Sequence, residues 1–570
     1  MRELLKKLHL ITRLLNTYRY IFLIILILPS VWWLTGSGFY NMHDDLQVMR
    51  IYEIERCFWD GQIPCRWSPD MSFGFGQPMF NYYSALPYYL GLFFKLVFST
   101  SIIGSVKFLF LFSLLAGGIG MYLLAKEFWG FWGGIIASVL YTYAPYHAVD
   151  VYVRGALAEN FSLAILPFLW LFIYRVIIKN EFRDRFILTI SISALLTTHN
   201  ISLLMFTPFT LLWIFFWYFK TKSPFQKLIV LGKSGLLGFG LASFFIIPVL
   251  FEQNLIQTQH LISEYYTYSS HFASLKQLFI SRFWGDGGSI FGPNDGMSFA
   301  VGWPHWWLLI LLIPLALKWV RNYEKPYGLL LLTLILMFLI SVFLTHQRSY
   351  LIWQSIDVMK YIQFPWRFLG LTIFFISFSG GAIGKLPAIL RYILIIIVIF
   401  STFYFNISYF TPVNYSRLVT DEGKFSGDSY ISLQKGGVAD YLPKEVKIIP
   451  DTPVRKEPLF IRGSGKVDYY NGRSNGFEAD IFSQTSSQVI FPYIYFPNWE
   501  IFVNGVKKDV TTDGVYDVIK IDLEKGVNTI EARFYNTPVR TISNLISVIS
   551  LLILGFTVIK RRKSMTLNVK

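Results

Sequence analysis

Long apolar runs recur along most of the chain, separated by short polar stretches. Four of them, at residues 21–34, 234–251, 329–344 and 392–405, each supply most of the ~20 apolar residues that a membrane-spanning helix needs. Backbone polar groups in lipid must find their partners within the segment, so these runs are expected to be helical. The pattern predicts an all-α polytopic membrane protein.

Applied to the whole chain, the same criterion predicts about twelve spans. We place them at residues 20–36, 102–124, 130–145, 160–178, 186–199, 201–219, 234–251, 304–320, 327–345, 366–383, 388–409 and 541–559. The first run follows a basic stretch, as in a signal peptide, but no convincing small-residue cleavage site follows it. Trp32 and Trp33 are typical of an interfacial aromatic belt, so this run is interpreted as a retained signal-anchor.

Clusters of basic residues at the ends of the spans determine the predicted topology. They lie at residues 2–19, 126, 179–185, 220–233, 318–325, 385 and 560–563. Pro87 and Lys95 interrupt the apolar segment 84–98. If this segment crossed the membrane, the later basic clusters would lie on the external side. We therefore expect a non-spanning interfacial or re-entrant helix there, with both termini in the cytoplasm.

The predicted external segments are long, whereas all the internal loops are short. The external loops of the transmembrane domain, residues 1–411, are 37–98, 146–159, 252–303 and 346–365. Residues 412–540 are predicted to form an external β-sandwich domain, and residues 541–570 a final helix with a basic cytoplasmic tail.

The β-sandwich prediction rests on β-branched and aromatic runs at 489–496, 518–523 and 528–534. Asn504-Gly505 between two such runs predicts a hairpin with a type I′ turn. Four aromatic residues in this region are interpreted as sandwich core in preference to a platform for sugar rings. They are Tyr493, Tyr495, Phe496 and Trp499.

Composition agrees with the membrane assignment. Hydrophobic residues make up 54% of the 570 residues and charged residues only 15%, which excludes an ordinary soluble protein of this length. The formal charge of +16 does not indicate nucleic-acid binding, because the basic residues mark helix ends and form no basic face with interleaved aromatics. The two cysteines, Cys57 and Cys65, exclude a disulfide scaffold or a zinc module, and whether they pair stays open.

The first external loop opens with His43, Asp44 and Asp45, directly beyond the first span. Adjacent carboxylates repel each other, so either one holds a proton or both share a cation or a cationic partner. Either arrangement suits a general base that takes a proton from an attacking hydroxyl. The alternative is that Asp44 or Asp45 caps the amphipathic helix predicted at residues 46–60.

Two later loops carry candidate phosphate ligands. A guanidinium at headgroup level grips two phosphate oxygens, which makes Arg154 such a candidate. An Arg154–Glu159 ion pair that fixes the loop, with Asp150 nearby, is the equal alternative. Arg348 and Arg367 are further candidates for the same phosphate, or else they snorkel to the membrane interface.

Histidines are concentrated in the predicted external segments. Those segments and the adjoining span ends hold seven of the eight histidines, namely His43, His147, His199, His260, His271, His305 and His346. His43 and His199 are candidates for substrate binding, and a divalent metal site is an alternative. The spacing matches no metal motif, and no other cofactor is predicted.

The sequence contains no P-loop and no dinucleotide fingerprint, and no predicted internal loop is long enough for a nucleotide-binding domain. The polar residues face a compartment that is normally poor in nucleotides. An enzyme working there needs a substrate that is already activated and delivered within the membrane. A lipid-linked phosphate sugar meets that need.

The order of these features resembles the GT-C superfamily of membrane glycosyltransferases. Within it, the chain looks like the YfhO-type and 6-pyruvoyl-tetrahydropterin synthase-related membrane proteins. The resemblance is carried by residues 43–45, 74–78 with 81–83, 152–156 with Glu159, 363–368, and the β-domain around 497–499.

This resemblance implies an enzyme that transfers a sugar from a polyprenyl-phosphate donor to an external glycan, lipid or protein acceptor. It implies Asp44 or Asp45 as the base and Arg154 or Arg367 as the phosphate ligand. The alternatives are a transporter or flippase of a lipid-linked substrate and a non-catalytic envelope assembly protein. Ionisable residues at the outer edge of the membrane, with no inverted repeat, favour the enzyme over the transporter.

Overall fold

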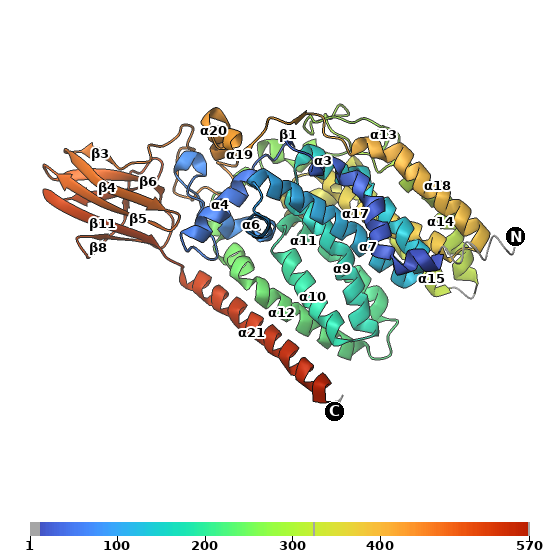
Figure 1. Cartoon of the computed structure of the whole chain (residues 1–570). Helices are drawn as coiled ribbons and strands as arrows, with labels where there is room; N and C mark the ends of the chain where they lie inside the picture. Colours follow the sequence, from blue (N-terminus) through green and yellow to red (C-terminus); the bar gives the residue numbers. More distant parts are fainter. Residues whose placement is uncertain (1–11, 323–324, 568–570) are drawn as a thin grey trace. The chain divides into compact units, whose positions relative to one another are not determined.

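The computed structural model describes residues 12–322 and 325–567 (Figure 1). The chain forms two compact units. Unit 1 contains the chain up to Asp44, Val106–Leu236 and Ile262–Val419. Unit 2 contains Asp45–Ser105, Leu237–Leu261 and the chain from Thr420 onward. Each unit is therefore assembled from segments that are far apart in the sequence.

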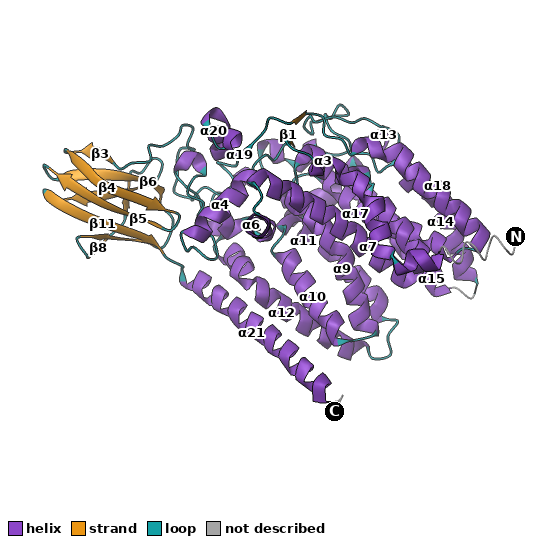
Figure 2. Cartoon of the chain, in the orientation of Figure 1, coloured by secondary structure: helices purple, strands orange, loops and turns teal. Residues whose placement is uncertain are grey.

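Unit 1 is helical, as its apolar runs predict (Figure 2). Its helices are α2 (Arg19–Ile27), η1 (Leu28–Val31), α3 (Trp32–Thr35), α7 (Ile102–Thr142), α8 (Pro145–Val149), η3 (Asp150–Arg154), α9 (Leu157–Ile178), α10 (Phe182–Leu196), α11 (Asn200–Tyr218), α13 (Leu275–Phe279), α14 (Trp303–Arg321), α15 (Lys325–Thr345), α16 (Tyr350–Ser355), η10 (Pro365–Phe368), α17 (Leu369–Gly380), α18 (Ala388–Asn406) and η12 (Ile407–Tyr409).

The described residues contain nine helices that are long and apolar enough to cross a membrane, and two shorter apolar helices. Helix α7 has 41 residues and a length of about 60 Å, twice the thickness of the hydrocarbon core. Its geometry breaks at Gly130 (φ 79°), so it accounts for the two spans predicted at 102–124 and 130–145. The first predicted span is the shorter helix Arg19–Thr35, and α10 has only 15 residues.

The chain is thus a multi-pass membrane protein, and the number of about twelve spans stays a prediction, because nine of the described helices are long and apolar enough to cross. The other short apolar helix, α6 (Leu86–Phe98), has 13 residues and is too short to cross, as expected for an interfacial helix. Arg2, Lys6 and Lys7, which support the predicted cytoplasmic N-terminus, lie outside the described residues.

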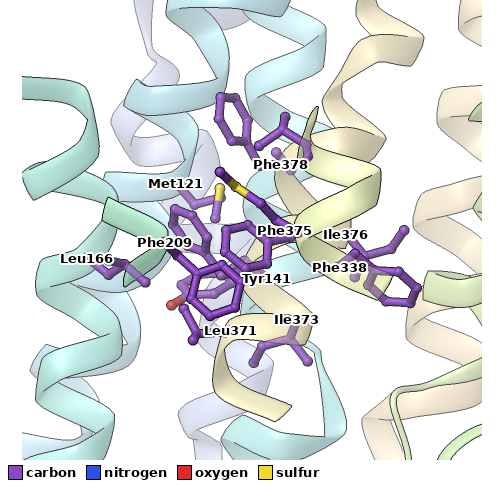
Figure 3. Packing of buried hydrophobic residues seen from close by; sticks show 14 of the residues in the cluster. Met121, Tyr141, Leu166, Phe209, Phe338, Leu371, Ile373, Phe375, Ile376 and Phe378 are labelled. Carbon is purple, nitrogen blue, oxygen red and sulfur yellow. The ribbon is translucent and has the colours of Figure 1, made fainter. Parts of the chain in front are cut away.

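Helix α17 is the centre of packing in unit 1, because every residue from Leu369 to Gly380 is buried. Figure 3 shows its Phe375 and Phe378 among apolar side chains of α7, α9, α11 and α15, including Met121 and Phe209. A helix that is apolar on all sides is typical of the interior of a large helix assembly. The turn η10, which carries Arg367, leads directly into this buried helix.

Unit 2 contains an antiparallel β-sandwich, with sheets ordered β3-β6-β10-β9 and β4-β5-β11-β7-β8. The strands are β3 (Leu459–Arg462), β4 (Gly465–Arg473), β5 (Gly476–Ser483), β6 (Ser487–Ile494), β7 (Trp499–Val503), β8 (Val506–Lys508), β9 (Thr511–Thr512), β10 (Val518–Leu523) and β11 (Gly526–Phe534). Its helices are α4 (Gln47–Trp59), α5 (Met79–Tyr82), α6, most of α12 (Pro224–Phe251), α19 (Asp421–Lys424), α20 (Gly427–Lys435) and α21 (Pro538–Leu567).

The predicted strands and hairpin are confirmed. Asn504 (φ 51°) and Gly505 (φ 76°) both adopt the positive φ that a type I′ turn requires. Tyr493, Phe496 and Trp499 are buried in the sandwich core, which confirms their structural interpretation.

The first loop adds to the same core. Its Trp67 ring lies 6.1 Å from that of Trp499 and 5.7 Å from that of Phe534. Cys57 and Cys65 form a disulfide, with their Cα atoms 5.5 Å apart. The loop and the sandwich thus share one hydrophobic core.

Candidate functional site

The second predicted external loop folds into the short helix α8 and the π-helical turn η3, which begins at Asp150 and ends at Arg154. Gly155 (φ 64°) terminates the turn in the left-handed region that glycine adopts readily. A Cβ at Gly155 would lie 2.2 Å from the Sδ of Met42, so the close approach also requires glycine. π-Helical turns occur frequently at functional sites, and here the turn aligns two charged side chains.

Arg154 is buried and contacts both acidic residues of its loop. Its Nη1 donates to Asp150 Oδ1, and its Nη2 donates to Glu159 Oε2 at 2.9 Å. Nη1 also donates to the hydroxyl of Tyr146 at 3.2 Å, and the guanidinium lies 4.5 Å from the centre of the Trp366 ring. The predicted Arg154–Glu159 ion pair is therefore present, with Asp150 as a second partner.

Arg367 brings a second guanidinium to the same carboxylate. Its Nε lies 3.4 Å from Glu159 Oε2, and its Nη1 donates to Ile362 O at 2.7 Å and to Gln363 Oε1 at 2.9 Å. Gln363 adopts a positive φ of 66°, which is costly for a residue with a side chain and is typical of functional sites. Two arginines and two carboxylates thus form one buried cluster.

Burial alters the protonation of this cluster and its neighbours. It raises the pKa of the Asp150 carboxyl well above its usual range, and the nearby Glu159 raises it further, against the opposing effect of Arg154. Asp150 Oδ2 has no hydrogen-bond partner among the residues described. Burial also lowers the pKa of His199 to about 3, against the opposing effect of Glu159 and with a smaller contribution from Arg367 and Arg154, so its imidazole is neutral. His199 Nδ1 bonds Ser202 at the start of α11.

The opening of the first loop runs beside this cluster. The backbone N–H groups of His43 and Asp44 donate to the carbonyl oxygens of Val153 (3.0 Å) and Arg154 (2.9 Å). His43 Nε2 lies 2.8 Å from the carbonyl oxygen of Asp286. Main-chain pairing thus places one predicted acid next to the predicted phosphate ligand.

The other acid of the pair, Asp45, has a cationic partner: its Oδ2 accepts a hydrogen bond from Lys424 Nζ. A cationic partner shared by both carboxylates was one of the arrangements expected, and the contact found involves Asp45. The helix that follows, α4, has Leu46 as its N-cap, and the Leu46 side chain makes no cap hydrogen bond.

The structure also shows the surroundings of Arg348 and of other histidines in the predicted external segments. Arg348 is exposed on the turn Gln347–Ser349, and His147 Nδ1 bonds Asn160 Oδ1 at 2.9 Å inside the helix assembly. His271 bonds Ser289 and the carbonyl oxygen of Tyr265. Within residues 12–322 and 325–567, no three His, Cys, Asp or Glu side chains lie close enough together to hold a metal ion.

Three residues of the cluster were not among the predicted site residues: Tyr146, Gln363 and Trp366. Tyr146 donates to Glu159 Oε1, and Trp366 Nε1 donates to Ser289 Oγ at 3.2 Å. Their signal in the sequence was weak, because aromatic residues are common near membrane interfaces. The positive φ of Gln363 has no sequence signature at all.

Comparison with known proteins places the chain in a family. Residues 80–413, more than half of the chain, match the model of the 6-pyruvoyl-tetrahydropterin synthase related domain, described as a membrane protein. This match confirms the family resemblance seen in the sequence. No curated protein matches the chain.

Two solved structures are distantly similar. ArnT from Cupriavidus metallidurans, bound to undecaprenyl phosphate, is 12% identical with a TM-score of 0.36, over 65% of this chain and 61% of that one. An Archaeoglobus fulgidus oligosaccharyltransferase, tethered to an acceptor peptide, is 13% identical with a TM-score of 0.41, over 74% and 59%. The chain spans about three fifths of their length, and a likeness this distant carries no information on activity.

Proposed function

The chain belongs to the 6-pyruvoyl-tetrahydropterin synthase related family of membrane proteins, and we propose that it is a GT-C-type glycosyltransferase. The donor is a sugar linked to a polyprenyl phosphate, and the acceptor is a hydroxyl of a glycan, lipid or protein. The reaction takes place at the outer face of the membrane, with both termini in the cytoplasm.

The observation that supports this proposal is the backbone hydrogen bond between Asp44 and Arg154, which joins the main chain of the proposed base to the main chain of one of two clustered arginines. A carboxylate takes the proton of an attacking hydroxyl, and guanidinium groups stabilise a departing phosphate. Both functions are needed in glycosyl transfer from a lipid phosphate.

In the proposed step, the acceptor oxygen attacks the anomeric carbon of the donor sugar while Asp44 takes the hydroxyl proton. The bond between that carbon and the phosphate oxygen breaks, and the lipid phosphate leaves with the electron pair. Asp44 is the preferred base because its main chain pairs with that of Arg154, whereas Asp45 forms an ion pair with Lys424.

The charge of the buried cluster suits an anion. Arg154 and Arg367 carry two positive charges, and Glu159 carries one negative charge. Burial favours the neutral form of Asp150, whose pKa is raised well above its usual range. Protonation of Asp150 gives the cluster a net positive charge that a donor phosphate can balance.

The test is sugar transfer by the purified full-length protein, with a panel of radiolabelled polyprenyl-phosphate sugars and candidate acceptors. We expect Asp44→Asn to reduce turnover by about 10²–10⁴-fold, the usual contribution of a general base. Asp45→Asn should have a smaller effect. Asp357→Asn is the matched control, because the Asp357 side chain is 95% exposed. Equal turnover in wild type and Asp44→Asn would reject Asp44 as the base.

A further inference from the structure

Unit 2 buries two arginines that take no part in the cluster around Arg154. Arg540 lies in the first turn of α21, and Arg66 lies in the first loop, directly after Cys65. The Arg540 side chain is 0% exposed, and Arg66 is 2% exposed. An arginine is rarely buried so completely unless its charge is paired and its N–H groups find acceptors. The partners of both side chains therefore decide what this part of the molecule can bind.

The carboxylate that meets Arg540 is Glu252, which follows the last residue of α12. Arg540 Nε donates to Glu252 Oε2 at 2.8 Å. Asn81 Nδ2 donates to the same oxygen at 3.0 Å, and the hydroxyl of Thr537 donates to Oε1 at 2.5 Å. Both oxygens of Glu252 are thus occupied by neighbouring donors, and its single charge can neutralise only one arginine.

Arg66 donates to uncharged oxygen atoms. Its Nη1 donates to Asn81 Oδ1 at 3.3 Å, and its Nη2 donates to Asn544 Oδ1 at 3.0 Å and to Phe244 O at 2.6 Å. Phe244 O is open to this bond because Pro248, four residues further along α12, has no N–H to donate to it. These contacts hold the guanidinium of Arg66 in place without neutralising it.

The site consequently holds more positive than negative charge. Arg66 and Arg540 contribute two positive charges, and Glu252 contributes one negative charge. Burial, and after it the charge of Arg540, lower the pKa of Arg66 to about 10, so Arg66 is still charged at neutral pH. Within residues 12–322 and 325–567, Glu252 is the one carboxylate in an ion pair with either arginine. A buried charge without a counter-ion is costly, so one negative charge is needed here.

The outer edge of the Arg540 guanidinium also lacks acceptors. Its Nη1 and Nη2 are buried, and in the part of the chain that the structure describes neither has a hydrogen-bond partner. The rings of Phe496 and Phe534, whose centres lie 5.0 and 5.2 Å from its Cζ, attract the charge. Aromatic rings are only weak acceptors for N–H groups. The two nitrogens therefore form a fork that suits an anion.

We propose that Arg540 and Arg66 bind a small monovalent anion of the size of chloride. Its single charge balances the excess charge of the two arginines, and it accepts the unpaired N–H groups of Nη1 and Nη2. The nearly complete burial of both side chains favours a monatomic ion over a phosphate, whose several oxygens would each need space and a donor. The positive end of the α21 helix dipole adds to the attraction.

The anion joins three parts of unit 2. Arg66 belongs to the first loop, Arg540 to the start of α21, and Glu252 to the end of α12. An ion that binds the folded chain and not the unfolded chain stabilises the fold. The stability of the protein should therefore depend on chloride, whether or not the chain performs the proposed sugar transfer.

The test is equilibrium binding of radioactive chloride to the purified full-length protein. We expect saturable binding of one ion per chain. The melting temperature should rise by about 2–4 °C when chloride replaces gluconate at constant ionic strength, the effect of a ligand at a few times its Kd. Arg540→Gln should weaken binding about 10–100-fold, the loss of hydrogen bonds to a charged group. Arg473→Gln, at an exposed arginine of β4, is the control and should leave binding unchanged.

Two further variants keep the test decisive if Arg540→Gln does not fold. Arg66→Gln leaves the Arg540–Glu252 ion pair in place but removes the excess charge, so it should also weaken chloride binding. Glu252→Gln raises the excess charge and should strengthen chloride binding, whereas loss of an ordinary structural ion pair would not.

Three outcomes would overturn the proposal. The first is folded wild-type protein that binds no chloride saturably. The second is binding that Arg540→Gln and Arg66→Gln leave unchanged, which would indicate an adventitious ion only. The third is displacement of chloride by phosphate or by phosphatidylglycerol at lower concentrations than by bromide, which would identify a phosphoryl group from solution or from lipid instead.

Discussion

The backbone N–H of Asp44 donates a 2.9 Å hydrogen bond to the carbonyl oxygen of Arg154. This bond joins the start of the first loop to the end of the π-helical turn η3. Gly155, the next residue, makes the approach possible because it has no side chain to collide with Met42. The relative position of the proposed base and phosphate ligand therefore depends on a glycine that performs no chemistry.

Gly155→Ala should separate the two loops and reduce sugar transfer together with stability. The left-handed backbone alone costs about 1–2 kcal/mol for a residue with a Cβ, and the contact with Met42 adds to this. Met42→Ala in the same chain removes the Sδ and should restore part of the loss. Gly61→Ala is the control, because Gly61 also has a positive φ (76°) but has open space around it. Thermal unfolding in detergent measures all four proteins, and equal losses at Gly61 and Gly155 would contradict the steric explanation.

Arg154→Gln should destabilise the protein strongly. It removes the ion-pair partner that lies 2.9 Å from the buried Glu159, and breaking a buried ion pair from one side costs about 3–5 kcal/mol. Arg348→Gln, at an exposed arginine, should stay within about 0.5 kcal/mol of wild type. Denaturant unfolding compares the two variants, and similar midpoints would mean that the cluster contributes little to stability.

Stability should fall in acid because of His199. Its pKa is lowered to about 3, so the unfolded chain takes up a proton below the ordinary histidine value of ~6.5 while the native protein does not. The contribution of His199 is complete above pH ~6.5 and is lost as the pH falls toward 3. His199→Gln should reduce the dependence of the melting temperature on pH over this range. His260→Gln, at a half-buried position, should leave that dependence unchanged. Parallel curves for wild type and His199→Gln would contradict the assignment.

The contribution of Asp150 to stability should change with pH in the opposite direction. Its carboxyl binds a proton more tightly in the native protein than in the unfolded chain, so its contribution is complete below the ordinary aspartate pKa of ~3.9. That contribution is lost as the pH rises through the raised native pKa. Asp150→Asn, which resembles the protonated form, should remove this decline in melting temperature. A steeper decline in the variant would indicate that the charged form of Asp150 stabilises the fold.

The disulfide offers a test of topology. Oxidised cysteines persist in oxidising compartments, so a Cys57–Cys65 bond in cells agrees with an external first loop. Intact cells are treated with a membrane-impermeant reductant and then with a thiol-reactive label, which should mark the protein only after reduction. Cys57→Ser with Cys65→Ser should cost about 2–3 kcal/mol for so short a loop. Labelling without prior reduction would mean that the two cysteines are free thiols and would contradict the predicted topology.

The sequence predicted the elements well and their assembly poorly. Apolar runs and the Asn504-Gly505 turn have local signatures, and the helices, the strands and the hairpin agree with the structure. The pairing of Asp44 with Arg154 uses main-chain atoms, which every sequence supplies, so side-chain patterns could not reveal it.

Local sequence also could not decide whether Arg154 is a phosphate ligand or an ion-pair partner. The structure shows the ion pairs, and the presence of Arg367 at the same Glu159 depends on the packing of α17. Contacts between residues so distant in the chain arise from tertiary structure. The sequence therefore identified the charged residues of the cluster but not the aromatic and strained residues that surround it.

The packing of Trp67 against Trp499 and Phe534 has a consequence for biosynthesis. The ribosome makes the first loop early, whereas the strands that cover Trp67 are among the last segments to emerge. Until then this indole has none of its sandwich partners, and the growing chain exposes an apolar surface that chaperones recognise. A premature stop codon anywhere before β7 would leave that surface uncovered, so truncated products should be degraded even when all their earlier helices have been inserted.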